Sequence, residues 1–182
     1  MRQEAHRQWL IMTGQTQTQV ATRVPTESEK KLAMKKANET FSPMPQQAVY
    51  AMLGLLDLKP GQLVYDLGCG DGRILKTANQ VYSCSVLGIE INPNTYKLAV
   101  ENLQDCVGWR VINADATKYN LEEADVVTLY MYPDVMDKMR FSTLKPGASV
   151  ISYNHDIPNL PTDKVTCELE GKTYTFYIHK KK

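Results

Sequence analysis

A glycine-rich segment is the first feature of the sequence that could do chemistry. Gly68, Gly70 and Gly72 form a G-x-G-x-G pattern, and Asp66 precedes it. A ligand pressed against the end of a strand needs backbone without side chains and φ values that glycine adopts freely. A dinucleotide fingerprint would have its third glycine where this chain has Arg73, and no Walker-type lysine follows. The pattern indicates a nucleotide-like ligand other than NAD or FAD, the alternative being a purely structural turn.

The second element is an acidic residue at the expected end of the next strand. Glu90 lies eighteen residues after Gly72, close to the spacing at which an acid holds the ribose of a bound nucleotide. Its carboxylate could accept hydrogen bonds from both ribose hydroxyls, with Ile91 beside it. The alternative is an acid that caps the helix beginning at Asn92.

The third element, Asp115, follows the expected third strand. A carboxylate there can accept from the exocyclic amine of adenine, while the backbone of Ala114 or Ala116 contacts the ring. An exposed turn aspartate is the alternative. Together with the glycine turn and Glu90, Asp115 narrows the expected ligand to S-adenosylmethionine (SAM). The residues assigned to the cofactor are Asp66, Gly68, Cys69, Gly70, Gly72, Glu90, Ile91, Asp115, Ala116 and Tyr130.

Two tyrosines near the end of the expected fourth strand are the candidates for catalysis. Tyr130 and Tyr132 stand just before Pro133. Aromatic rings there can form a narrow cage around an amine and stabilise developing positive charge. A tyrosine or a chain of waters could take the proton of the amine. The alternative is that both rings pack a strand end. His155, at the same sheet edge, is a candidate base or substrate contact, or else a structural or exposed loop residue.

These residues need a scaffold, and the hydrophobic pattern predicts alternating helices and strands. The expected helices cover about 46–57, 74–80, 92–103 and 135–139. The expected parallel strands cover 63–65, 85–89, 109–112, 125–131 and 148–153, and residues 165–169 and 173–178 are expected to form a hairpin. The crossover over 114–124 is too short for a full helix.

This alternation predicts an α/β fold with a Rossmann-like, doubly wound sheet. We expect seven strands, mostly parallel, with a C-terminal antiparallel hairpin, which is the pattern of the methyltransferase sheet. Residues 41–182 are expected to form this domain, and residues 1–40 a polar N-terminal arm.

The arm shows little that would fold by itself. Short helices are conceivable near Glu4–Met12 and Thr26–Asn38, but neither has an apolar stripe. The arm is therefore expected to be loosely docked or partly disordered. Beyond it, Pro43 and Pro45 break any helix, and Pro45 is well placed to open the next one.

Composition and charge limit the classes of protein to which this chain can belong. The chain of 182 residues is 43% hydrophobic and 23% charged, as in ordinary soluble globular proteins. Residues 41–179 hold eleven basic and sixteen acidic residues, whereas residues 1–40 and the last three residues each carry a net charge of +3. An acidic body is poorly suited to following a phosphate backbone and suits a basic protein or peptide substrate. A solvated surface with two basic ends is the alternative.

Other sequence features concern compartment and metal. The four cysteines are dispersed, without zinc-site spacing, which indicates reduced, mostly buried thiols and no metal site. No apolar run approaches the roughly 20 residues of a transmembrane helix, and no signal-peptide core is visible. Arg2, Arg7 and Arg23 would suit an organellar transit peptide, which the neighbouring glutamates oppose. We expect a soluble, intracellular protein, in the cytoplasm.

Four segments together resemble the small protein-lysine methyltransferases of the ATP-synthase c-subunit type and their prokaryotic relatives. They are residues 41–45 (FSPMP), 65–74 (YDLGCGDGRI), 124–130 (ADVVTLY) and 144–147 (LKPG). The resemblance covers about residues 41–157. It implies N-methylation of lysine side chains of a protein, with Pro43 and Pro45 closing over the site and Tyr130 lining the methyl-transfer channel.

Two other functions stay open from the sequence. One is methylation of a small molecule or an RNA, although no Asn-Pro-Pro-Tyr element marks a nucleobase site. The other is a catalytically silent, SAM-binding partner protein, which would keep the glycine turn and Glu90. Methyl transfer from labelled SAM would distinguish these functions.

Overall fold

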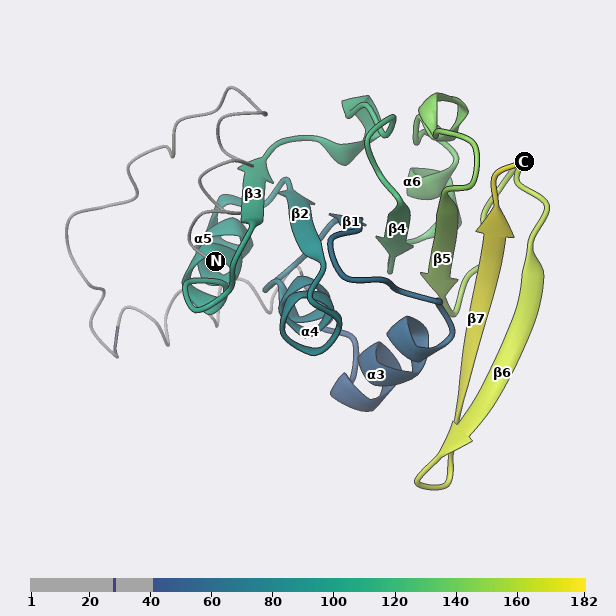
Figure 1. Cartoon of the computed structure of the whole chain (residues 1–182), viewed down its shortest axis with the longest axis horizontal. Coiled ribbons are helices and arrows are strands. Elements are labelled where there is room, and N and C mark those ends of the chain that lie inside the picture. The colour runs from purple at the N-terminus through teal and green to yellow at the C-terminus, as the bar shows by residue number, and fades with distance from the viewer. Residues whose placement is uncertain (1–27, 29–40) are drawn as a thin grey trace.

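The structure is a computed structural model that describes Ser28 and residues 41–182. The predicted arm of residues 1–40, with its two expected helices and the expected transit-peptide arginines, otherwise lies outside the described residues. The described chain builds a 7-stranded sheet in the order β3-β2-β1-β4-β5-β7-β6 (Figure 1). The strand order reverses between the parallel neighbours β1 and β4, and such a switch point is where ligands bind in open α/β sheets.

Five adjacent parallel strands make up most of the sheet, and β3 is its edge strand on that side. They are rich in β-branched and aliphatic residues and largely buried on both faces, as parallel strands between helical layers must be. Their bounds are β1 Leu63–Leu67, β2 Ser85–Glu90, β3 Trp109–Asn113, β4 Val126–Leu129 and β5 Ser149–Tyr153. All five carboxyl ends meet at one edge of the sheet, where the candidate residues follow them.

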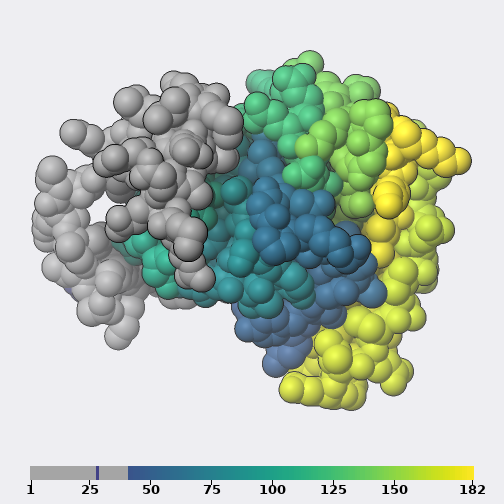
Figure 2. All heavy atoms as spheres, in the orientation of Figure 1, coloured from purple at the N-terminus to yellow at the C-terminus, as the bar shows by residue number. Residues whose placement is uncertain are grey.

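An antiparallel hairpin completes the sheet, as predicted. It consists of β6 (Asp163–Leu169) and β7 (Lys172–Lys180), and β7 pairs with β5. Glu170 and Gly171 have φ values of 52° and 72°, which match the two left-handed residues of a tight hairpin turn. Figure 2 shows the tip of the hairpin next to α3 (Gln46–Gly54).

Helices cover both faces of the sheet. On one face lie α3, α4 (Arg73–Tyr82) and α5 (Pro93–Asn102), and on the other α6 (Pro133–Met136) (Figure 1). Two hydrophobic clusters fill the space between the sheet and these layers. The second face also carries two 3-10 turns, η1 (Ala116–Lys118) and η2 (Phe141–Thr143). The short crossover predicted over 114–124 therefore holds only η1.

The α/β fold class and its seven-strand order agree with the sequence prediction, and element ends differ in places. The helix expected over 46–57 ends at Gly54. The helix expected over 135–139 is wrong in its bounds, because Pro133 opens it two residues earlier at a position that needs no N–H donor. Strand β4 ends at Leu129, so Tyr130 follows the strand directly.

Two expectations about the chain can be compared with the described residues. None of the helices in residues 41–182 is long and apolar enough to cross a membrane. The four cysteines carry free thiols, three of them buried: Cys69, Cys84 and Cys106, with Cys167 half-buried.

Candidate active site

The glycine turn joins β1 to α4 and is fastened to the end of β2. Gly68 and Gly70 have φ values of 74° and 56°, in the left-handed region that glycine reaches without strain. The N–H groups of Gly68 and Cys69 both donate to the carbonyl oxygen of Ile89, at 2.8 and 3.1 Å. The turn is therefore held in a fixed position at the carboxyl edge of the sheet.

Side chains press closely on the glycines. A Cβ added at Gly68 would lie 2.6 Å from Cε of Met131, and one added at Gly70 would lie 2.3 Å from Cε2 of Phe41. Gly72 is less crowded, since an added Cβ would lie 3.3 Å from Cδ1 of Leu103 and 3.4 Å from Ala99 of α5. The alternation of glycines thus serves close approach on several sides of the turn.

Glu90 ends β2 and reaches the turn with its side chain. Its Oε2 accepts the N–H of Gly70 at 2.9 Å, and its Oε1 accepts the N–H of Asn92 at 2.8 Å. The cap of α5 is Asn92, whose Oδ1 accepts from the N–H groups of Asn94 and Thr95. Each oxygen of the Glu90 carboxylate can accept a further hydrogen bond. Glu90 lines the cavity described below, so a ligand can use that capacity.

Asp66 is the most deeply buried acid of the site, with 1% of its surface exposed. Its Oδ1 accepts from Oγ1 of Thr128 at 2.8 Å, whereas its Oδ2 has no hydrogen-bond partner in the described structure. Burial raises the pKa of Asp66 to about 7; the bond from Thr128 opposes the rise, and the charges of Glu90 and Asp71 add to it. A buried carboxylate with a free oxygen is costly unless a donor or a cation reaches it.

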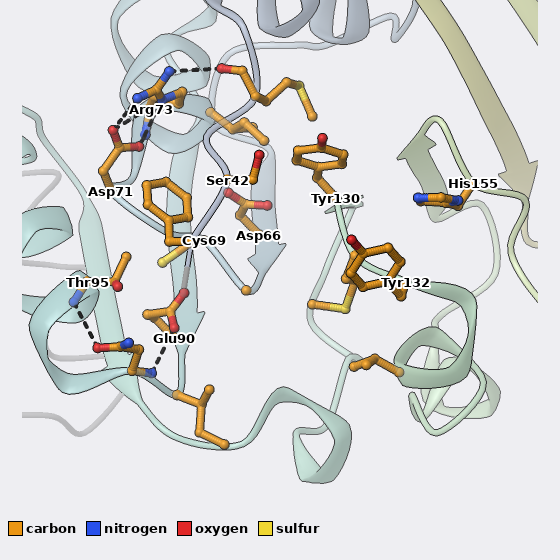
Figure 3. A pocket seen from close by; sticks show the side chains of 18 residues that line it. Ser42, Asp66, Cys69, Asp71, Arg73, Glu90, Thr95, Tyr130, Tyr132 and His155 are labelled. Atoms are coloured by element: carbon orange, nitrogen blue, oxygen red, sulfur yellow. Dashed lines mark hydrogen bonds and ion pairs between the residues drawn. The ribbon is translucent and has the colours of Figure 1, made fainter. Parts of the chain in front are cut away.

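A cavity of about 620 Å³ opens at this edge of the sheet (Figure 3). That volume lies within the roughly 300–1,000 Å³ typical of small-molecule sites. The predicted site residues that line it are Asp66, Gly68, Cys69, Glu90, Ile91, Tyr130, Tyr132 and His155. The predicted site residues outside the lining are Gly70, Gly72, Asp115, Ala116, Pro43 and Pro45.

The substrate-side residues lie together across the cavity from the acids. Figure 3 shows Tyr130, Tyr132 and His155 on one side, and Glu90 and Asp71 on the other. The ring of Tyr132 is 5.6 Å from that of His155, and 71% of Tyr132 is exposed.

An aromatic stack supports Tyr130 from behind. Its ring centroid is 5.0 Å from that of Tyr153, which in turn packs on Tyr174 and Phe176 of β7. Tyr153, Tyr174 and Phe176 are buried. Buried aromatic rings therefore back the cavity wall at Tyr130, and exposed Tyr132 packs against half-buried His155.

The carboxylate of Asp115 interacts with residues two and three positions further along the chain. Its Oδ1 accepts from the N–H and the hydroxyl of Thr117 at 3.0 and 2.7 Å, and its Oδ2 lies 3.6 Å from Nζ of Lys118. The hydrogen bonds from Thr117 hold the pKa of Asp115 below its ordinary value. In this arrangement Asp115 caps η1.

Several lining residues were not predicted from the sequence: Phe41, Ser42, Met44, Asp71, Arg73, Ile74, Asn92, Thr95, Met131 and Val135. Phe41, Ser42 and Met44 lie beside Pro43 and Pro45, which are the residues of this segment that were predicted to close over the site. Thr95 is 1% exposed, and its Oγ1 has no partner in the described structure. A hydroxyl one turn into a helix that starts at the binding edge was the available signal for Thr95.

The donor and acceptor set fits SAM. The cavity offers acceptor oxygens at Glu90 and Asp66 to a molecule that carries ribose hydroxyls, an ammonium group and a sulfonium. It offers a turn without side chains at Gly68 and an aromatic wall at Tyr130. A sheet of this order with this cavity defines the class of S-adenosylmethionine-dependent methyltransferases.

Residues 66–164 match the family model of the ANTKMT methyltransferase domain, and the chain belongs to that family. It is 29% identical over 147 residues to a protein-lysine N-methyltransferase of Saccharolobus islandicus, covering 76% of this chain and 91% of that protein. It is 29% identical over 140 residues to the adenine nucleotide translocase lysine N-methyltransferase of Mus musculus, covering 70% of this chain but 58% of the mouse protein.

A solved structure is also similar in sequence and fold. It is described as an RNA methyltransferase from Salinibacter ruber in complex with S-adenosyl-L-homocysteine (SAH). Its TM-score is 0.68 at 36% identity, and the alignment covers 76% of this chain and 92% of the other. SAM is therefore the cofactor of this chain, and methyl transfer is its reaction class.

Proposed function

We propose that this chain transfers a methyl group from SAM to the ε-amino group of a lysine in a protein. The observation that carries the proposal is the group of aromatic residues Tyr130, Tyr132 and His155, which line one side of the cavity. The charged residues that line the cavity are mainly acidic. The cation among the described lining residues, Arg73, is paired with Asp71. Such a site suits an amine or ammonium substrate.

The cofactor would be held by groups with unused hydrogen-bonding capacity. In this proposal the Glu90 carboxylate accepts from the ribose hydroxyls, and the free Oδ2 of Asp66 accepts from the ammonium group. Ile91, 67% exposed at the rim, would pack on the adenine ring. Asp115 and the backbone of Ala116 would reach the adenine amine if the Asp115 side chain turned from Thr117. Cys69 and the glycines would supply the close backbone surface.

Bound SAM supplies an electrophilic methyl group on its sulfonium. The lone pair of the neutral acceptor amine forms the new N–C bond as the C–S bond breaks, its electron pair stays on sulfur, and the amine's extra proton leaves to water. The ring of Tyr130 would stabilise the positive charge on nitrogen, and Tyr132 with His155 would contact the lysine stem. Most of the acceleration would come from alignment of the two reacting atoms.

RNA is the second candidate acceptor, favoured by the relative from Salinibacter ruber that is described as an RNA methyltransferase. The charge of residues 41–179 supports a protein instead, although the whole chain has a net charge of +1. Residues 41–179 carry sixteen acidic and eleven basic residues, and the described cavity lining holds three carboxylates, at Asp66, Asp71 and Glu90, against one arginine. Proteins that follow a phosphate backbone present unpaired lysine and arginine near the site.

The test is transfer of tritiated methyl groups from SAM into a cell extract. Full-length protein is incubated with the extract, and samples are then digested with protease or with ribonuclease. The proposal predicts that the label is removed by protease and resists ribonuclease. Label that is released only by ribonuclease, or that stays in small molecules, would contradict it. A Glu90→Ala variant distinguishes transfer by this chain from background transfer.

A further inference from the structure

Arg73 stands where a dinucleotide-binding turn would have its third glycine, and its guanidinium joins two parts of the site. Its Nε lies 3.0 and 3.1 Å from the two carboxylate oxygens of Asp71, and its Nη2 lies 2.6 Å from Oδ2. Its Nη1 donates to the carbonyl oxygen of Met44 at 2.9 Å (Figure 3). One side chain therefore connects the first turn of α4 to the segment before α3.

That segment together with the first residue of α3, residues 41–46, is called the strap below. It contacts α4 and the glycine turn at three points. At its start, the ring of Phe41 lies against Gly70. In its middle, the carbonyl of Met44 accepts from Arg73. At its end, Nε2 of Gln46 donates to Oγ1 of Thr77 at 3.0 Å.

The strap forms part of the cavity wall. Phe41, Ser42 and Met44 line the cavity, and Figure 3 shows Ser42 close to the side that carries Tyr130. Part of the cavity wall therefore belongs to the strap.

The pair that holds the strap is partly buried. The side chains of Arg73 and Asp71 are 28% and 11% exposed. A planar guanidinium can bind a carboxylate with two N–H groups and still donate to a carbonyl, whereas a lysine ammonium is a point charge and cannot reproduce that fork.

We infer that Arg73 is a positioning residue that holds the strap against the glycine turn and so sets how tightly the cofactor is bound. Arg73 acts through the strap, because its guanidinium N–H groups already donate to the Asp71 carboxylate and to the Met44 carbonyl. The inference rests on the proposed cofactor site. It differs from direct binding of the cofactor's carboxylate by Arg73, which would not need the strap.

The experiment is a double-mutant cycle on the full chain, read by calorimetric titration with SAH. The variants are Arg73→Lys, which keeps the charge, Phe41→Ala, which releases the other end of the strap, and the double variant. Lys76→Arg is the matched control, because Lys76 lies on the same helix and contacts Asp105 and the Asn102 carbonyl, neither of which belongs to the strap. The fitted stoichiometry corrects each titration for the folded fraction.

The inference predicts that Arg73→Lys raises the Kd for SAH roughly tenfold, since one charge-assisted hydrogen bond is lost. Phe41→Ala is expected to raise the Kd for SAH as well. In the double variant the Kd should rise by much less than the product of the two single increases, because both changes free the same segment. Lys76→Arg is expected to bind as the wild type does.

Two results would overturn the role of Arg73. An unchanged Kd for Arg73→Lys would show that the strap does not depend on it. Fully multiplicative losses in the double variant would show that Arg73 acts on the cofactor without the strap. Wild-type protein that fails to bind SAH would instead contradict the proposed function, so the two failures are distinguishable.

Discussion

The carboxylate of Glu90 accepts the N–H of Gly70 at 2.9 Å, although the two residues lie twenty positions apart in the chain. The acid proposed to hold the ribose thus also braces the turn proposed to hold the rest of the cofactor. Its other oxygen accepts the N–H of Asn92, at the start of α5. One side chain therefore ties the ends of β1 and β2 into a single binding edge, and changes at Glu90 should affect both.

Replacement of Glu90 gives the first prediction. Glu90→Ala removes the brace and the two ribose contacts proposed above, each worth about 1.5–3 kcal/mol because the acceptor is charged. We expect the Kd for SAH to rise roughly a hundredfold or more. Glu90→Gln should lose less, since its amide oxygen still accepts. Calorimetry tests this, with exposed Glu122→Gln as control. Unchanged affinity in Glu90→Ala would remove Glu90 from the site.

The raised pKa of Asp66 makes stability depend on pH. Burial raises the pKa of Asp66 from 3.8 to about 7 in the folded chain, so the folded state holds this proton more tightly than the unfolded state. The contribution to stability is full below about pH 4, is lost as pH rises from about 4 to 7, and is level above that. Denaturant unfolding of the cofactor-free protein should show this fall, and Asp66→Asn should reduce it.

Cofactor binding should show the opposite pH dependence. An ammonium group favours the ionised form of Asp66, so we expect the affinity for SAH to increase as pH rises through about 7. Calorimetry at about pH 6 and pH 8 measures this, and binding should release a proton at the lower pH. In Asp66→Asn the affinity should be lower and nearly independent of pH across this range. A variant with wild-type pH dependence would assign the effect to another group.

The close approach at Gly70 allows a matched pair of glycine replacements. Gly70→Ala combines a left-handed φ of 56° with a Cβ 2.3 Å from the ring of Phe41, whereas Gly61→Ala has a φ of 83° and open space around it. Both should lose about 1–2 kcal/mol of stability for the backbone conformation. Only Gly70→Ala should also displace Phe41 and weaken SAH binding. Equal SAH affinity in the two variants would contradict the contact between strap and turn.

Tyr130→Phe separates the chemical step from cofactor binding. The change keeps the aromatic wall and its packing on Tyr153 but removes the hydroxyl. We expect turnover to fall no more than several-fold, because the ring proposed to stabilise the charge on nitrogen is kept, while the Kd for SAH changes little. Single-turnover rates and calorimetry give the two quantities. The opposite pattern would move Tyr130 into the cofactor pocket.

Much of the fold and eight of the eighteen residues that line the cavity could be predicted because they follow from local sequence patterns. Gly68 and Glu90 were predicted because both belong to patterns of residues that are close together in the sequence. Gly68 lies in a glycine pattern after an apolar strand, and Glu90 is an acid at the end of the next strand. The same holds for Tyr130, which follows β4 directly.

The other site residues could not be predicted, because their roles depend on contacts between distant segments or on hydrogen bonds to neighbouring residues that compete with the ligand. Arg73 meets Met44 across 29 positions of the chain, and no periodicity in either segment indicates that contact. Asp115 follows β3 as predicted, but its carboxylate is used by Thr117, because short polar side chains readily bind their own backbone. The unpaired hydroxyl of Thr95 becomes visible only when the burial around it is known.

The central claim is methyl transfer to lysine, and tandem mass spectrometry of the acceptor tests it most directly. The protein that gains label from SAM is isolated from the extract, digested and sequenced by fragmentation, with the Glu90→Ala enzyme run in parallel. We predict a methyl group on a lysine ε-nitrogen, absent from the parallel sample. A methyl group on another side chain, or label confined to RNA, would contradict the claim.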